Sequence, residues 1–423
     1  MVMSEIRIIH LADIHLGFSG PTSLIFDASE KEDAPGRYVR EVDIERAVGR
    51  MVKAIVHEQQ PPVDVVVIAG DLFHRPAPYP RAISRAAKFV RRLVENGIGV
   101  VIIDGNHEVT SVLHTGSPTT FLKELGSYVA NSNTYEIFRQ CWDHLPDEKR
   151  EKLERLVVHA LPYRAVAENT EFSGVRPLPG YTNILVTHGR VSGMDDLNSL
   201  HRTAAPVPTE LLRRGWDYVA LGDWHIHRYQ PLHDVPAFYS GSLEALTFGE
   251  AMSYPPRTDD SYAVHGALDI RLQEGTPVIV QTFANREARP VLRLESIDAT
   301  DMDATELMKI LRQRLQGNFS TKSLIQLKVN NCPPQAWEQL DFTELAELRK
   351  KVLRCEILPD ISWPMLVQSD ETVSETKLDT QWQRFIELRE QDAEECAWYR
   401  DEGMKRIEDA QTALLAEQAQ IGG

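Results

Sequence analysis

The chain has 423 residues, enough for two or three domains, and its hydrophobic content of 42% is ordinary for a globular protein. The net charge of −16 argues at first against a nucleic-acid partner. However, residues 367–423 hold 14 acidic and 6 basic side chains, a net of −8, so half of the excess lies in this tail. No apolar run approaches the ~20 residues of a membrane span, and the first residues lack a signal-peptide pattern.

The cysteines indicate a reducing compartment. Cys141, Cys332, Cys355 and Cys396 are widely spaced and form no CxxC pair. This usage argues against a disulfide framework and against a thiolate zinc site. We therefore expect a cytoplasmic protein without a membrane partner.

Five apolar segments predict strands covered on both faces. They are residues 6–12, "DVVVIAGD" (64–71), "GVVIIDGNH" (99–107), "TNILVTHG" (182–189) and "WDYVALGD" (216–223). Helical pieces lie between several of them, beginning with residues 43–59. This alternation predicts an α/β layered domain, in which ligands bind beyond the carboxyl ends of the strands.

A second, smaller unit is predicted after a break near residues 286–290. Asp303 and Glu306 have the spacing of a helix cap, and Asp341 and Glu344 repeat it. A half-buried strand at 324–329 lies between the two helices. The predicted parts are therefore a first domain (1–288), an α+β domain (291–363) and an acidic helical tail (366–423).

Each apolar strand ends in a polar cluster. The candidate ligands are Asp13, His15, Asp71, Asn106, His188, His225 and His227, and His107 lies beside Asn106. Carboxylate, amide and imidazole groups without thiolate suit Mn²⁺, Fe²⁺ or Zn²⁺. Seven ligands fit two ions that share a bridging carboxylate, the usual apparatus for hydrolysing phosphate esters. One such motif alone is weak, because turns also favour these residues; the inference depends on all five clusters occurring in order.

The motifs "LADIHLG", "IAGDLFHRP", "DGNHE", "VTHG" and "ALGDWHIHR" resemble the ordered signature of calcineurin-like metallophosphoesterases. "GDLFH" and "FYSGSLEALTFGE" are similar to the DNA double-strand-break nuclease branch, whose bacterial member is the SbcD-type exonuclease subunit. The resemblance implies a layered β-sandwich flanked by helices, with a small α+β capping domain and a helical C-terminal tail. It covers residues 5–285 by specific motifs and 291–363 only by general layout.

The resemblance also implies roles for individual residues. One ion would be held by Asp13, His15, Asp71 and His227, and the second by Asp71, Asn106, His188 and His225. His107 would face the scissile phosphate and help to protonate or stabilise the leaving oxygen, with His74 as a second phosphate-facing histidine. The alternative for His74 is a surface-loop residue. Mn²⁺ is the first expectation for both ions, with Fe²⁺, Zn²⁺ and Mg²⁺ as alternatives.

The sequence departs from the family pattern in two places. Glu108 stands where the family usually has Asp, and its extra methylene could alter how a carboxylate orients His107. "GDWHIH" replaces the usual Gly-His-x-His, which makes Asp223 and Trp224 additional. Asp223 either accepts a hydrogen bond from a ligating imidazole or displaces one histidine, because Asp223 and His225 also have i, i+2 spacing.

Residues 75–92 contain six basic residues and no acidic one. On a helix, one stripe would hold Arg81, Arg85, Lys88 and Arg92, and the opposite stripe Ile83, Ala87, Val90 and Val94. The basic stripe is either a solvated face or a surface that attracts the phosphate backbone of DNA. The resemblance implies a two-fold dimer contact in this region, to which residues 117–125 could contribute.

The tail places Leu378, Trp382 and Phe385 at helical spacing on an acidic background. Such a helix could dock in a partner's groove or pack on its own chain, and the resemblance implies an SbcC-type coiled-coil ABC ATPase as the partner. The expected function is a metal-dependent DNA nuclease, exonuclease or endonuclease, acting on DNA ends or hairpins in double-strand-break repair. The alternatives are a phosphatase or cyclic-nucleotide phosphodiesterase on the same scaffold, and a non-catalytic DNA-end scaffold.

Overall fold

The computed structural model of the protein describes residues 5–18, 37–58, 61–109, 116–169, 171–194, 205–254 and 264–361. Contacts along the chain divide it into two units, Met1–Ser362 and Trp363–Gly423. The predicted tail and its apolar positions Leu378, Trp382 and Phe385 lie outside the described residues. Within the described ranges, no helix combines the length and apolar character that a membrane span needs.

A six-stranded sheet carries the first three polar clusters. Its strands follow the order β14-β13-β1-β2-β3-β4. They are β1 (Ile6–Leu11), β2 (Val65–Ala69), β3 (Gly99–Ile103), β4 (Tyr128–Ala130), β13 (Gly266–Leu272) and β14 (Ile279–Ala284). Strands β1 to β4 are parallel, so the carboxyl ends of β1, β2 and β3 meet at one edge.

A five-stranded sheet packs face to face against the first. Its order is β11-β10-β7-β6-β5. The strands are β5 (Glu136–Arg139), β6 (Leu156–Leu161), β7 (Thr182–His188), β10 (Tyr218–Gly222) and β11 (Ala237–Tyr239). Val67, Val101, Ile184 and Ala220 belong to the buried core between the two sheets. The apolar runs of β2, β3, β7 and β10 are thus buried on both faces, as the sequence predicted.

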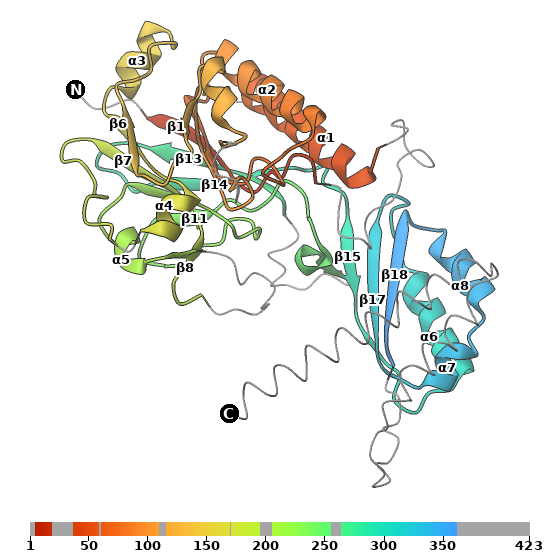
Figure 1. The fold of residues 1–423 in the computed structure, drawn as a ribbon. Helices are drawn as coiled ribbons and strands as arrows, with labels where there is room; N and C mark the ends of the chain where they lie inside the picture. The colour runs from red at the N-terminus through yellow and green to blue at the C-terminus, as the bar shows by residue number, and fades with distance from the viewer. Residues whose placement is uncertain are drawn as a thin grey trace, which may run out of the picture. The chain divides into compact units, whose positions relative to one another are not determined.

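Helices complete the layers on the two outer faces (Figure 1). Helices α1 (Val39–Lys53) and α2 (Pro80–Glu95) cover the first sheet, and α4 (Tyr163–Glu168) and α5 (Thr209–Leu212) cover the second. A π-helical turn, η3 (Ala54–Glu58), follows α1, and α3 (Asp147–Leu153) precedes β6. A short parallel pair, β8 (Arg190–Val191) and β9 (Pro206–Val207), lies outside the main sheets. The predicted α/β layered fold is confirmed.

The orientation of α2 differs from the prediction. If the apolar stripe opposite the basic one were the buried face, Ile83 and Ala87 would be buried, but Ile83 is 36% exposed and Ala87 is only half-buried. The buried face is one residue away along the helix and contains Ala82, Ala86, Phe89, Val90 and Leu93. The reason is that the ring of Phe89 joins the core and turns the neighbouring positions outward.

The basic stripe of α2 is partly neutralised by the neighbouring helix. Arg85 Nε lies 2.7 Å from a carboxylate oxygen of Glu45, and Arg81 Nη1 lies 3.5 Å from one of Glu41. Both glutamates belong to α1. Because Arg81 and Arg85 are paired with glutamates, this half of the basic stripe is better interpreted as a solvated face than as a surface that attracts DNA.

Residues 291–361 build most of a third sheet with its own core. The strands are β12 (Met252–Tyr254), β15 (Val291–Leu294), β16 (Ile297–Asp298), β17 (Leu324–Cys332) and β18 (Arg354–Ile361). Their order is β12-β15-β17-β16, and β18 also pairs with β17. Helices α6 (Ala304–Leu315), α7 (Pro334–Glu338) and α8 (Phe342–Arg349) pack on this sheet. Strand β12 joins it from within the range 1–288, so the chain enters this sheet before the proposed boundary.

The residues that the sequence predicted as helix caps, Asp303 and Asp341, cap α6 and α8 in the structure. The Asp303 side chain accepts a hydrogen bond from the backbone N–H of Glu306, and the Glu306 side chain reaches back to complete a capping box for α6. Asp341 caps α8 by accepting from Glu344 N. Local hydrogen bonding therefore sets where both helices begin.

A buried charged network joins α1 to the segment that leads into this third sheet. The Arg289 guanidinium binds Asp43 through two contacts, of 2.6 and 2.7 Å. Arg40 binds the same carboxylate, and Arg289 Nη1 donates to Lys322 O at 2.9 Å. Glu244 accepts from Arg289 N at 2.9 Å. All four charged side chains are buried, so each depends on its partners for the solvation it has lost.

Asp43→Ala should lower the free energy of unfolding by about 3–5 kcal/mol, because Arg40 and Arg289 would remain buried without their shared carboxylate. Urea unfolding followed by circular dichroism measures the change. Asp147→Ala is the matched control, because the Asp147–Arg150 pair lies on the surface and its loss should change stability little. Equal effects of the two substitutions would contradict the role given to the network.

Candidate metal centre

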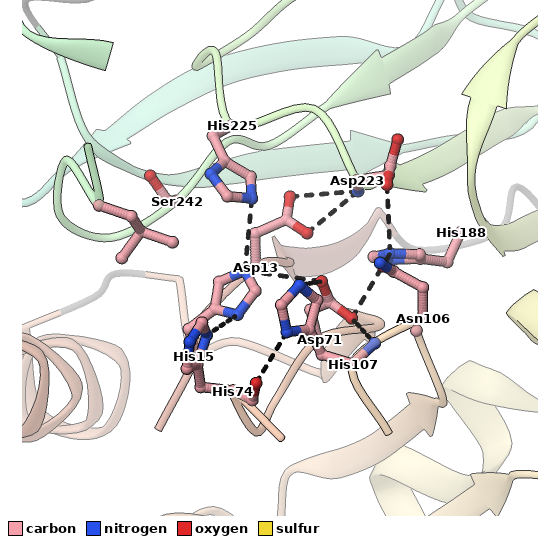
Figure 2. A network of polar contacts seen from close by, with 12 residues as sticks. Asp13, His15, Asp71, His74, Asn106, His107, His188, Asp223, His225 and Ser242 are labelled. Atoms are coloured by element: carbon pink, nitrogen blue, oxygen red, sulfur yellow. Dashed lines mark hydrogen bonds and ion pairs between the residues drawn. The ribbon is translucent and has the colours of Figure 1, made fainter. Parts of the chain in front are cut away.

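Polar side chains from both sheets converge at the carboxyl ends of the strands (Figure 2). Asp13 and His15 follow β1, Asp71 follows β2, and Asn106 and His107 follow β3. The second sheet contributes His188, at the end of β7, and the segment after β10. Residues from five separate parts of the chain therefore share one site, as is usual for sheets of this class.

The backbone after β1 and β2 is shaped to bring these side chains together. Asp13 N donates to Gly70 O at 3.2 Å, and His15 N donates to Asp71 O at 2.9 Å, so the two segments stay bonded beyond the strands. Asp13, His15 and Asp71 have φ values of 52°, 53° and 53°. This left-handed conformation costs of order 1–3 kcal/mol at each non-glycine residue and persists only where the surroundings impose it.

Asp71 lies between two groups of candidate ligands. Its Oδ2 is 3.5 Å from His15 Nε2, and its Oδ1 is 3.5 Å from His188 Nε2. Ligand atoms of Asp13, His15 and His225 lie within 4.8 Å of one another, and so do those of Asp13, Asp71 and His188. A Cβ on Gly105 would collide with the Asp71 carboxylate, so glycine is required there. One carboxylate thus presents one oxygen to each group.

The second group is completed around His188. Its Nε2 is 2.9 Å from Asn106 Oδ1 and 3.9 Å from Asp223 Oδ1. His188 Nδ1 donates to Ala69 O at 2.8 Å. Because that bond fixes the proton on Nδ1, the lone pair of Nε2 faces the cluster.

The structure does not bring His227 to this cluster. His227 Nδ1 donates to Ser240 O at 2.7 Å, and its Nε2 lies 3.2 Å from Thr282 Oγ1 on β14. Asp223, with φ of 98°, turns the chain after β10, so that Asp223 and His225 are the i, i+2 pair at the cluster. The expected pairing of His225 with His227 does not fit this geometry, and the alternative in which Asp223 displaces one histidine does.

Burial and mutual repulsion make the charged forms of Asp13 and Asp71 unfavourable unless a cation is present. Burial, followed by the charge of Asp13, raises the pKa of Asp71 well above its usual range. Burial likewise raises the pKa of Asp13. Asp223 Oδ2 is buried and has no hydrogen-bond partner among the described residues. Crowded carboxylates and one carboxyl oxygen without a hydrogen-bond partner fit divalent cations, which would supply the missing opposite charge.

The surroundings of His225 raise its pKa and so favour its protonated, positively charged form. Burial alone would lower its pKa, but the carboxylates of Glu250, Asp13 and Asp71 outweigh burial and raise the pKa to about 10. Its Nε2 lies 3.3 Å from His15 Nε2, inside the first group. In the ion-free protein, the positive charge of protonated His225 therefore lies beside the ligand atoms to which a cation would bind.

His107 and His74 lie together at the mouth of the site. His107 Nδ1 donates to His74 O at 2.7 Å, and its Nε2 is 4.0 Å from Asp71 Oδ2. The two rings stack with centroids 5.0 Å apart, and the His107 side chain is 34% exposed. Burial lowers the pKa of both, that of His74 to about 4, so both are neutral at pH 7 without substrate.

Glu108 acts on the backbone of the ligand loops. Its carboxylate accepts hydrogen bonds from Asp71 N (3.1 Å), Phe73 N (2.7 Å) and Gly105 N (2.8 Å). From the sequence, Glu108 is expected to influence the orientation of His107. The structure instead shows its carboxylate tying the loop after β2 to the loop after β3.

Two further contacts near the site involve residues of quoted motifs to which the sequence assigned no role. Glu250 Oε1 lies 3.2 Å from His225 Nδ1. Trp224 lies under the guanidinium of Arg190, which is 5.0 Å from the ring centroid. Glu250 is 25 residues from His225 in sequence, so no local spacing could have linked them.

The model of the calcineurin-like phosphoesterase family matches residues 6–227, more than half of the chain. The chain belongs to the calcineurin-like phosphoesterase family. Members of this family use divalent metals, and the ligand cluster of this calcineurin-like phosphoesterase is consistent with that use.

Curated relatives are similar at modest identity. "DNA double-strand break repair protein Mre11" of Methanopyrus kandleri is 26% identical over 260 residues, 58% of this chain and 50% of the relative. The protein of the same name from Methanocaldococcus jannaschii is 28% identical over 262 residues, 60% of this chain and 61% of the relative. "Uncharacterized metallophosphoesterase YhaO" of Bacillus subtilis is 29% identical over 301 residues, 68% of this chain and 66% of the relative. The chain spans less than two thirds of the length of the two Mre11 proteins.

The placement of Asp223 and His227 gives a direct test. Asp223→Ala should weaken Mn²⁺ binding by at least about tenfold, because it removes a carboxylate from the second group. His227→Gln should leave Mn²⁺ affinity near that of the unmodified protein, because His227 contacts Ser240 and Thr282. Isothermal titration calorimetry measures both. If His227→Gln abolished binding as fully as Asp223→Ala, the geometric assignment would be wrong.

Metal binding should release protons at neutral pH. His225, with its pKa of about 10, is protonated at pH 7 in the ion-free protein, whereas a ligating imidazole must be neutral. Binding therefore displaces this proton, and affinity should rise with pH below 10, by up to about tenfold per unit. Calorimetry in buffers of different ionisation enthalpy gives the number of protons released. No proton release at pH 7 would contradict the assignment of His225.

Proposed function

We propose that this protein is a metal-dependent nuclease that hydrolyses phosphodiester bonds at DNA ends or hairpins. The observation that carries the proposal is the position of Asp71, whose two oxygens each face a separate group of candidate ligands. The partly exposed His107 beside it gives a substrate phosphate a place to bind. Two of the relatives are named as DNA double-strand break repair proteins, which favours DNA as the substrate.

The proposed ligands follow the geometry. One ion would be held by Asp13, His15, Asp71 and His225, and the other by Asp71, Asn106, His188 and Asp223. Two divalent ions bound here would supply a water of lowered pKa and neutralise charge on the phosphoryl oxygens. Mn²⁺ is the first candidate, and Fe²⁺, Zn²⁺ and Mg²⁺ are the alternatives.

His107 is proposed as the residue that supplies a proton to the leaving oxygen. Its Nδ1–H is committed to His74 O, so Nε2 is the atom that can meet the substrate. The negative charge of a bound phosphodiester would favour a proton on Nε2 and reverse the effect of burial on the pKa. That proton can then pass to the departing alkoxide as the P–O bond breaks. His74 supports the ring of His107 by stacking and lies close enough to share the phosphate.

We also propose a homodimer that works with an SbcC-type ABC ATPase. Ile83 and Tyr79 are exposed on and beside α2, which supports a dimer contact there. Lys53, Lys88 and Arg92 line a groove between α1 and α2, which supports a path for the phosphate backbone of DNA. The acidic, aromatic-bearing tail supports an ATPase partner on sequence grounds alone.

The purified protein should cut labelled linear and hairpin DNA in the presence of Mn²⁺. Asn106→Ala should abolish cleavage by removing a ligand, and His107→Ala should slow it by about 100-fold or more while metal binding persists. His233→Ala is the control, because His233 is an exposed histidine outside the cluster and its loss should not change the rate.

The same assay separates the alternatives. An absence of metal-dependent cleavage, with or without an SbcC-type ATPase, would exclude the nuclease proposal. Turnover of a phosphopeptide or a cyclic nucleotide under those conditions would favour the phosphatase or the cyclic-nucleotide phosphodiesterase. DNA binding with none of these activities would favour the non-catalytic scaffold.

A further inference from the structure

Glu250 lies outside the ligand cluster but contacts it directly. Its Oε1 is 3.2 Å from His225 Nδ1, and the opposite nitrogen of that ring, Nε2, faces His15 at 3.3 Å. The two side chains are 13% and 17% exposed, so water has little access to the contact. A carboxylate at Nδ1 holds the ring with Nε2 turned toward the ligand group.

The carboxylate of Glu250 is itself held firmly. Its Oε2 accepts from Leu246 N at 2.9 Å, and its Oε1 accepts from Thr247 Oγ1 at 3.1 Å. Ser242, at the start of the same loop, donates its backbone N–H to His225 O at 3.2 Å, and it lies beside His225 in Figure 2. Loop 242–250 therefore fixes both the backbone and the ring of His225.

This loop is also fixed to the sheet of residues 291–361. Glu250 ends the short helix η6 (Phe248–Glu250), and β12 begins two residues later. Strand β12 pairs with β15, and the Arg293 guanidinium on β15 donates to Phe248 O. The Phe248 side chain packs with Val291 and Leu324. The residue that orients His225 thus belongs to a segment anchored on the sheet of residues 291–361.

We propose that Glu250 is a positioning residue for the metal centre, which orients His225 and makes its position depend on the sheet of residues 291–361. The proposal rests on the proposed function only in that it takes His225 as a ligand. Glu250 contacts the imidazole and is not itself placed among the ligands. Movement of β15 relative to the first sheet would be transmitted through Phe248 and Glu250 to His225.

The test measures Mn²⁺ binding by calorimetry, independently of DNA cleavage. Glu250→Ala should weaken the ion held by Asp13, His15 and His225 by about 10- to 100-fold and leave the other ion unchanged. Glu250→Gln should recover most of the loss, because its amide oxygen can still accept from Nδ1–H. Arg293→Ala should weaken the same ion by a smaller factor, because it loosens the anchor of η6. Glu287→Ala is the control, because its side chain is 75% exposed.

Unchanged Mn²⁺ affinity in Glu250→Ala would overturn the proposal. Equal weakening of both ions together with a lowered melting temperature would also overturn it, because that result indicates general structural support. Unchanged affinity in Arg293→Ala would overturn the link to the sheet of residues 291–361. If the unmodified protein binds two ions but cuts no DNA, the nuclease proposal fails while the effect of Glu250→Ala on metal binding still stands.

Discussion

The Asp71 carboxylate is buried between two groups of candidate ligands, and much of the surrounding structure compensates for the cost of placing it there. A buried anion near a second carboxylate, Asp13, is unfavourable unless donors or cations surround it. The backbone N–H of His107 donates to Asp71 Oδ1 at 3.0 Å, and the imidazoles of His15 and His188 flank its two oxygens. The sheets converge so that these groups from distant parts of the chain meet one side chain.

The loops that hold these side chains have strained backbone conformations, and contacts outside the cluster offset the cost. Asp13, His15, Asp71 and Asp223 all have positive φ values. The buried cores on both faces of the strands and the three hydrogen bonds to Glu108 supply the support that keeps these loops in place. Glu108 therefore matters through the backbone that it fixes. Its extra methylene, relative to Asp, extends the carboxylate by about one C–C bond toward those amides.

The site is also connected to structure beyond the two sheets that form it. The buried Asp43–Arg289 pair joins α1 to the segment before β15, and η6 joins the His225 loop to β15 itself. Both connections converge on the sheet of residues 291–361. This sheet therefore contacts the phosphoesterase fold through a charged network and through the segment next to a candidate ligand, so it is positioned to influence the metal centre.

The sequence by itself determined the layered α/β fold, the strands that end in polar clusters and the helix caps at Asp303 and Asp341. These features follow from local rules: apolar runs bury strands, parallel strands end at one edge, and a cap needs an acceptor next to its own N–H groups. The spacing of apolar residues predicted the helix α2. It placed the buried face one residue away from its position in the structure, because the packing of Phe89 decides that orientation.

Only the tertiary structure decided which residues of "GDWHIH" face the cluster. Asp223 with His225 and His225 with His227 have the same i, i+2 spacing, so spacing cannot choose between them. The choice depends on the left-handed turn at Asp223 and on Ser240 and Thr282, which bind His227 from other segments of the chain. The role of Glu250 could likewise be inferred only from the structure, because its contact with His225 joins residues that only the fold brings together.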